Sequence, residues 1–242
     1  MHVWYFIKKI IYNYIKKIKK GEYNYNILII QIKNMKVLLI NGSANENGCT
    51  YTALSKVAET LNEENIETEM LYLGNKPIAD CMGCKTCYKQ GHEEKCVFDD
   101  IVNEIIQKAR ECDGFVFGTP VYYAHSSGRL LSVLDRTFYA GKNAFAFKPG
   151  ASVASARRAG TTASIDVINK YFTINQMPIV SSTYWNNVHG NTPEEVLQDK
   201  EGMQTMYNLG KNMAWLLKCI EAGKKQNIQY PQNSVIKTNF IR

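Results

Sequence analysis

Short apolar runs and longer amphipathic stretches alternate along the chain from Met35 onward. The apolar runs predict strands at 36–41, 67–73, 115–117, 151–156 and 178–183. Apolar residues at three- and four-residue spacing predict helices over about 50–63, 101–112, 127–139, 162–172 and 192–223. Strands that alternate with helices form a parallel sheet covered on both faces, so the predicted fold class is α/β.

Three polar loops follow predicted strands, at 42–50, 118–126 and 155–162. The carboxyl ends of parallel strands lie at one edge of the sheet, where ligands of such folds gather. We therefore expect these loops to converge on one site.

The loop GSANENGCT at 42–50 joins an apolar strand to a helix. A nucleotide-triphosphate loop requires a Lys where Cys49 stands, and the dinucleotide pattern G-x-G-x-x-G is also absent. The hydroxyls of Ser43 and Thr50 are neutral donors that suit a bound monophosphate beside a helix N-terminus. The loop alone leaves two interpretations open: a phosphate site of the FMN kind, or an ordinary strand-to-helix turn capped by Thr50.

Residues 1–34 differ in composition from the rest and predict a basic amphipathic N-terminal extension. They carry seven Lys and one Glu, hence +6 of the net +7, which leaves about +1 for the remainder. A nearly neutral remainder does not predict nucleic-acid binding. The extension either lies on an anionic membrane surface or is dispensable, even a wrongly assigned start. We favour the second, because Met35 directly precedes the first strand.

At the polar loops the chain resembles the flavodoxin-like NAD(P)H-dependent FMN reductases, in particular the branch that includes the iron–sulfur flavoproteins. The matching stretches are GSANENGCT (42–50), GTPVYYAHSSGRLLSVLDR (118–136), SARRAGTT (155–162) and a cysteine cluster. The resemblance implies a flavodoxin-like three-layer sandwich with a five-stranded parallel sheet of order 2-1-3-4-5. It places the FMN-binding domain at 35–223, with a cysteine-rich loop at 78–98, and leaves a C-terminal tail at 224–242.

The resemblance also implies which residues bind FMN. The first loop would hold the phosphate, the second would run along the isoalloxazine ring, and the third would approach its pyrimidine edge. In that order the residues are Ser43, Asn45, Gly48, Cys49 and Thr50; Pro120, Val121, Tyr122 and Tyr123; Arg157, Arg158, Ala159 and Gly160. The two arginines either stabilise negative charge on the reduced flavin or serve as surface charges or ligands of the nicotinamide cofactor's phosphate.

Four of the seven cysteines, Cys81, Cys84, Cys87 and Cys96, fall in the loop at 78–98. The start of the chain lacks a signal-peptide pattern, so we expect a cytoplasmic protein, in which clustered cysteines indicate metal or redox chemistry. Two-residue gaps followed by a later fourth cysteine are typical of a 4Fe–4S cluster. The eight-residue gap before Cys96 is longer than in the iron–sulfur flavoproteins. Structural zinc, with His92 as an alternative ligand, and free thiols that bind nothing remain open.

These features predict an FMN-dependent oxidoreductase that uses NAD(P)H and passes electrons to a quinone, a nitro or azo compound, free flavin or another acceptor. Because the flavin carries the chemistry, no catalytic side chain is predicted. The alternative is a non-enzymatic electron carrier of flavodoxin or iron–sulfur flavoprotein type. The expected partners are a small-molecule electron acceptor and further copies of the chain in a homodimer or homotetramer, with no nucleic acid.

Overall fold

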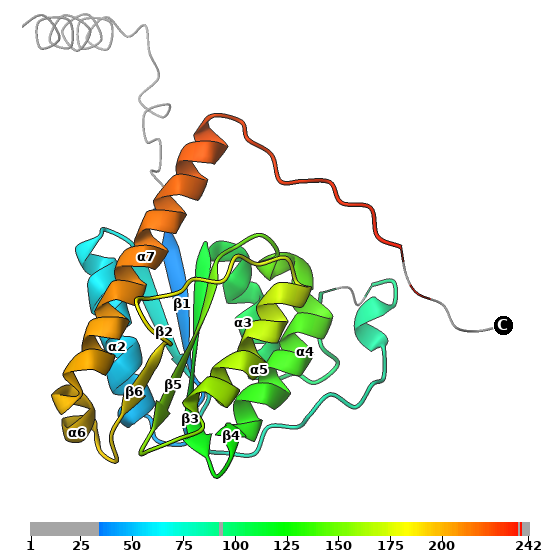
Figure 1. Ribbon diagram of the computed structural model, residues 1–242. Coiled ribbons are helices and arrows are strands. Elements are labelled where there is room, and N and C mark those ends of the chain that lie inside the picture. Colours follow the sequence, from blue (N-terminus) through cyan, green and yellow to red (C-terminus); the bar gives the residue numbers. More distant parts are fainter. Residues whose placement is uncertain (1–33, 92–93, 237, 239–242) are drawn as a thin grey trace, which may run out of the picture. The chain divides into compact units, whose positions relative to one another are not determined.

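A parallel sheet in the order β2–β1–β3–β5–β6 forms the centre of the fold (Figure 1). The computed structural model describes residues 34–91, 94–236 and 238, so the predicted helix of the N-terminal extension lies outside the described residues. The parallel strands are β1 (Lys36–Asn41), β2 (Glu67–Tyr72), β3 (Gly114–Tyr122), β5 (Gly150–Ala156) and β6 (Asn187–His189). Counted alone, they follow the expected order 2-1-3-4-5, which confirms the flavodoxin-like fold. The two-residue β4 (His125–Ser126) is an addition, paired antiparallel to β3.

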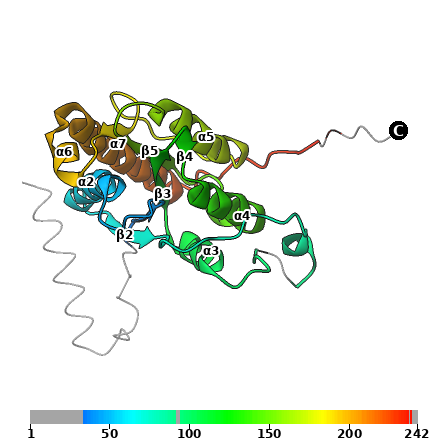
Figure 2. The same cartoon turned by 90° about the horizontal axis from the view of Figure 1, so that it is seen from below.

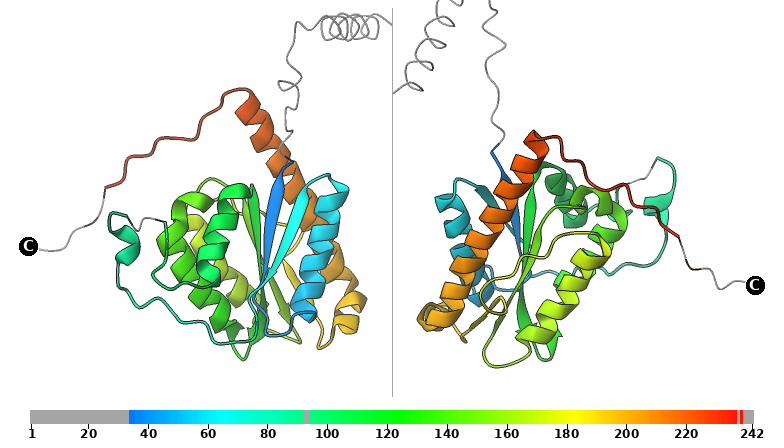
Figure 3. Two further views of the ribbon diagram at one scale, coloured as in Figure 1. Left: turned by 180° about the vertical axis from the view of Figure 1, so that it is seen from behind. Right: turned by 45° about the horizontal axis from the view of Figure 1, so that its top comes forward.

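Helices cover both faces of the sheet because successive side chains of a strand point to opposite faces. Val37 and Leu39 of β1 face the layer of α2 and α7, whereas Leu38 and Ile40 face the layer of α3, α4 and α5 (Figure 3). The helices are α2 (Cys49–Glu63), α3 (Ile101–Glu111), α4 (Gly128–Phe145), α5 (Thr161–Ile174), α6 (Pro193–Gln198) and α7 (Lys200–Lys225), with the short η2 (Thr86–Tyr88).

The helix starts follow from local sequence. The carboxylate of Asp100 accepts a hydrogen bond from the amide of Val102 at 3.1 Å and so caps α3. Thr192 caps α6 by accepting from the amide of Glu195, and Pro193 occupies the first helical position, as its missing donor allows. The described residues contain no helix with the length and apolar character needed to span a bilayer.

The prediction of a strand over 178–183 is wrong. Ile179 forms only an isolated bridge with Gly150, and the chain then leaves the sheet until β6 begins at Asn187. The apolar run ends at Val180, so the hydrophobic pattern indicated this isolated bridge and not a strand of the sheet. It gave no signal for β6, because Asn187 is polar although it is buried. The carboxyl end of the last strand therefore lies about six residues later than expected.

Candidate functional site

Four loops meet at the carboxyl edge of the sheet and line one cavity of about 200 Å³; Figure 2 views the fold from this edge. The structure brings together eight residues predicted for this site. They are Ser43, Asn45, Cys49, Thr50, Pro120, Val121, Tyr122 and Arg157. Predicted residues that do not line the cavity are Gly48, Tyr123, Arg158, Ala159 and Gly160, although each belongs to one of the same loops.

Hydrogen bonds within the chain hold the loop after β1 in shape. Buried Asn41 accepts from the amide of Ser43 at 3.1 Å and donates to the carbonyl of Glu46 at 2.9 Å. The Ser43 hydroxyl accepts from the amide of Asn45 at 3.0 Å. Because Asn41 stands at the last position of β1, the strand itself fixes the start of the loop.

The first turn of α2 is available to an anion. Gly48 occupies the N-cap position and provides no side chain to cap the helix. The first amides of a helix lack intrahelical partners, and the helix dipole adds partial positive charge at this end. The Thr50 hydroxyl does not cap the helix, since it is fully buried and pairs with the Ser155 hydroxyl at 2.8 Å. The expectation that Thr50 caps this helix is therefore wrong.

Tyr122 braces the first loop as well as lining the cavity. Its hydroxyl accepts from the amide of Ala44 at 3.1 Å, and the hydroxyl of Tyr72 donates to the carbonyl of Ala44 at 2.6 Å. Tyr123 is fully exposed and has a left-handed backbone with φ of 61°. The two adjacent tyrosines therefore differ: the first is tied to the loop after β1 and the second projects into solvent.

The loop after β5 directs one arginine to the cavity. Arg157, Arg158 and Ala159 are all exposed, and of the three Arg157 lines the cavity. Gly160 has φ of 91° and occupies the N-cap position of α5, with its carbonyl accepting from the amide of Ser164 at 3.1 Å. The turn at Gly160 brings this loop against the segment that contains Val121 and Ala124.

Sequence reasoning missed four residues that line the cavity: Ser155, Ala156, Gly190 and Asn191. Gly190 and Asn191 follow β6, so placing the last strand at 178–183 hid them. The Cys49 thiol donates to the carbonyl of Gly190 at 3.6 Å, which joins this fourth loop to the N-terminus of α2. Burial, the largest cause, raises the pKa of the Cys49 thiol. The rule that ligands gather beyond strand ends would have found Gly190 and Asn191, had β6 been located.

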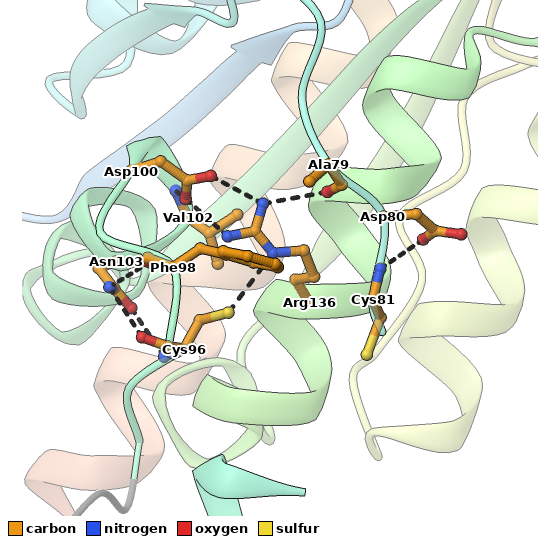
Figure 4. Close-up of polar contacts among 9 residues, drawn as sticks. All are labelled: Ala79, Asp80, Cys81, Cys96, Phe98, Asp100, Val102, Asn103 and Arg136. Atoms are coloured by element: carbon orange, nitrogen blue, oxygen red, sulfur yellow. Dashed lines mark hydrogen bonds and ion pairs between the residues drawn. The ribbon is translucent and has the colours of Figure 1, made fainter. Parts of the chain in front are cut away.

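A second cavity, of about 350 Å³, is lined by the four loop cysteines and by Arg136 of α4. Figure 4 draws Arg136 with two of these cysteines, Cys81 and Cys96. Burial raises the pKa of the Cys87 thiol, and the neighbouring thiols act in the same direction. Hydrogen bonding to the Thr86 side chain and backbone lowers the pKa of the exposed Cys84. No three described His, Cys, Asp or Glu side chains form a group ready to hold a metal ion. The donor set of four thiols nevertheless suits a thiolate-ligated metal group.

The doubly wound sheet and the cavity at its carboxyl edge, hereafter the rim cavity, define an α/β protein of flavodoxin type. A family profile of NADPH-dependent FMN reductases matches residues 35–192. The chain therefore belongs to this family of flavin oxidoreductases, and its fold places the rim cavity where doubly wound sheets bind ligands.

Two similar proteins indicate the branch of the family that this chain resembles. An iron–sulfur flavoprotein of Methanocaldococcus jannaschii is 33% identical over 199 residues, which cover 77% of this chain and 100% of that protein. An iron–sulfur flavoprotein of Methanosarcina thermophila is 28% identical over 195 residues, covering 78% of this chain and 99% of its own. The resemblance to this branch is thereby confirmed.

A solved structure supports the fold. RosB with bound 8-demethyl-8-formylriboflavin-5'-phosphate matches with a TM-score of 0.59 at 13% identity, over 85% of this chain and 92% of RosB. At this identity the likeness shows the fold alone.

Proposed function

We propose that the protein is an FMN-dependent oxidoreductase that takes electrons from NAD(P)H. It would pass them to a quinone, a nitro or azo compound, free flavin or another acceptor. FMN, when bound, supplies the hydride-accepting chemistry, and the protein supplies binding, orientation and electrostatics. The observation that carries the proposal is the rim cavity, formed by four loops beside the uncapped N-terminus of α2.

The residues of this chain fit FMN. The first amides of α2, with the shaped loop after β1, would hold the phosphate. Pro120 and Val121 would lie along the ring, since proline lacks an amide donor and permits flat packing. Arg157 would place positive charge near the pyrimidine edge, where it stabilises the negative charge gained on reduction.

The test combines a visible spectrum of the purified protein with rapid mixing. Flavin absorbance should be present as purified or appear after FMN is added. Anaerobic mixing with NADH and with NADPH, in separate experiments, should bleach that absorbance rapidly with one or both. A protein that binds FMN but is bleached by neither nucleotide would instead support the electron-carrier alternative. A protein that cannot take up FMN would refute both.

We also propose that Cys81, Cys84, Cys87 and Cys96 bind a 4Fe–4S cluster. Support comes from the four thiols lining one cavity and from the iron–sulfur flavoproteins among the relatives. Iron, acid-labile sulfide and zinc should be measured after anaerobic purification. About four iron and four sulfide per chain would support the cluster. About one zinc, or no metal, would support the two alternatives.

We propose a homodimer or homotetramer, with a small-molecule electron acceptor and no nucleic acid as partner. Exposed aromatic side chains near the ends of the sheet support self-association, since Tyr123, Tyr184 and Trp185 are all at least half exposed. Light scattering coupled to size-exclusion chromatography would give the subunit number directly.

A further inference from the structure

Among the described residues Arg136 is the largest fully buried side chain; it lies behind the cysteine loop, with only 2% of its surface exposed. Its guanidinium donates two hydrogen bonds of 2.8 Å to the Asp100 carboxylate and one of 3.1 Å to the carbonyl of Ala79. Its Nε donates to the Cys96 sulfur at 3.4 Å, as Figure 4 shows. The ring of Phe98 covers the guanidinium at 4.7 Å. A buried arginine of this kind is rigid, because its planar donors are nearly all engaged.

The backbone of Cys96 is fixed as firmly as its sulfur. Its amide donates to Asn103 Oδ1 at 2.8 Å, and Asn103 Nδ2 donates back to its carbonyl at 3.1 Å. The same Nδ2 also donates to the carbonyl of Phe98 at 2.9 Å. Cys96 is therefore held by α3 through Asn103 and by α4 through Arg136.

The segment with the other three cysteines is held differently. From Cys81 to Tyr88 the described hydrogen bonds are local: the Cys81 amide donates to Asp80 Oδ1 at 2.7 Å and the Tyr88 amide donates to the carbonyl of Lys85 at 3.1 Å. Just before them, Ala79 is tied to α4 by Arg136. Cys84 is exposed, and Gly83 and Lys85 both have positive φ. The Cys96 thiol thus accepts a hydrogen bond from α4, while Cys81, Cys84 and Cys87 lie on a segment whose own hydrogen bonds are local and which contacts the core through Cys87.

We propose that Arg136 is a positioning residue for the metal group of this cavity: held by Asp100, it presents Cys96 as the preset fourth ligand and keeps a cationic donor on that ligand's sulfur. The proposal rests on the proposed 4Fe–4S cluster. It explains how the long gap before Cys96 is compatible with a cluster, because α3 and α4 hold this cysteine through Asn103 and Arg136. A cationic donor on a ligand sulfur stabilises the more negative state, so it raises the reduction potential of the cluster.

The experiment compares the full-length wild type with Arg136→Gln, which removes the charge, and Arg136→Lys, which retains it but loses the bidentate geometry. The matched control is Arg129→Gln on the same helix, where Arg129 is partly buried and donates to the backbone carbonyls of Lys76 and Asn75. All proteins are purified anaerobically. Iron and sulfide per chain, the midpoint potential of the cluster by EPR-monitored titration, and the rate of iron transfer to a chelator are measured.

Arg136→Gln should lower the cluster potential and speed iron release about tenfold, the effect of losing one charge-assisted hydrogen bond. Arg136→Lys should fall between it and wild type, and Arg129→Gln should match wild type. If Arg136→Gln fails to fold, as shown by lost flavin, Arg136→Lys decides. A wild-type cluster with unchanged potential and release in both Arg136 variants would overturn the inference and leave the proposed function standing. Wild type without iron and sulfide would overturn the cluster itself, and this inference with it.

Discussion

At the scale of single residues, Gly160 shows how one backbone conformation joins two loops of the rim. Its φ of 91° is disfavoured for any residue with a Cβ. An added Cβ would also lie 2.8 Å from Val121 Cγ1 and 3.1 Å from the carbonyl oxygen of Ala124. The loop after β5 can therefore approach the loop after β3 only because this position is glycine.

We predict that Gly160→Ala lowers the free energy of unfolding by about 1–3 kcal/mol, from backbone strain and overlap together. It should also weaken FMN binding, because the two loops separate. Urea unfolding and FMN fluorescence titration measure the two effects. Gly128→Ala is the matched control, since an added Cβ there meets nothing within 4 Å. Similar behaviour of the two variants would contradict the prediction.

At the scale of elements, α2 and α7 pack closely where they cross. An added Cβ on Gly210 of α7 would lie 2.6 Å from Thr60 Cβ and 3.2 Å from the carbonyl oxygen of Val57, both on α2. This close approach seals the face of the sheet that carries Val37 and Leu39. The position of α2 also matters for the site, since its N-terminus faces the rim cavity.

We expect Gly210→Ala to destabilise the fold by about 1–3 kcal/mol, because the helices must move apart to admit a methyl group. Gly223→Ala, near the end of the same helix, should be neutral or stabilise by up to about 1 kcal/mol, because its nearest new contact is at 3.7 Å and alanine is the better helix former. Chemical denaturation of both variants provides the comparison. Equal stabilities would show that the crossing tolerates a wider separation.

The same two helices are joined by ion pairs. Glu64, at the end of α2, accepts hydrogen bonds from Lys211 and Lys218 of α7, and these lower its pKa from 4.5 to about 2. A lowered carboxyl pKa stabilises the folded state fully above about pH 4.5, and this contribution disappears as the pH falls through about 2.

Glu64→Gln should therefore be slightly less stable than wild type at pH 7, and the difference should vanish between about pH 4.5 and pH 2. The effect is small because the pair is near the surface, and added salt should reduce it further. Urea unfolding at constant ionic strength measures the difference across this pH range. Glu63→Gln, one residue earlier, serves as the control. A difference that persisted at pH 2 would mean that the Glu64 side chain acts through packing rather than charge.

At the scale of the whole molecule, the strongly basic segment ends where the match to the family begins. The extension of residues 1–34 carries +6 of the net +7, and the family match begins at residue 35. The described unit Met35–Arg242 contains both cavities. The two cavities assigned to the proposed chemistry therefore lie beyond the extension.

We predict that a chain starting at Met35 folds, retains FMN and is reduced by NAD(P)H at the rate of the full-length chain. Spectra, rapid mixing and sedimentation with anionic vesicles should be compared for the two. We expect no difference in any of them. Sedimentation of the full-length chain alone would instead favour the membrane-surface interpretation of the extension.

Much of this architecture was predictable because its signals are local. The alternation of patterns gave the α/β class, and the loop stretches gave the family. Eight of the thirteen residues predicted for FMN line one cavity. The misplaced last strand shows what the hydrophobic pattern could not predict. Burial of Asn187 depends on pairing with Ala154, a partner 33 residues away in the chain, and nothing near Asn187 signals it.

The sequence by itself determined the alternation of strands and helices as far as β5, three of the four loops at the strand ends and the cysteine cluster, since each depends on residues close together in the chain. Only the tertiary structure decided that Gly190 and Asn191 complete the rim, that Tyr122 supports the loop at Ala44, and that Arg136 joins Asp100 to Cys96. These contacts unite segments tens of residues apart. Their geometry is set by how the helices pack on the sheet, which no local pattern encodes.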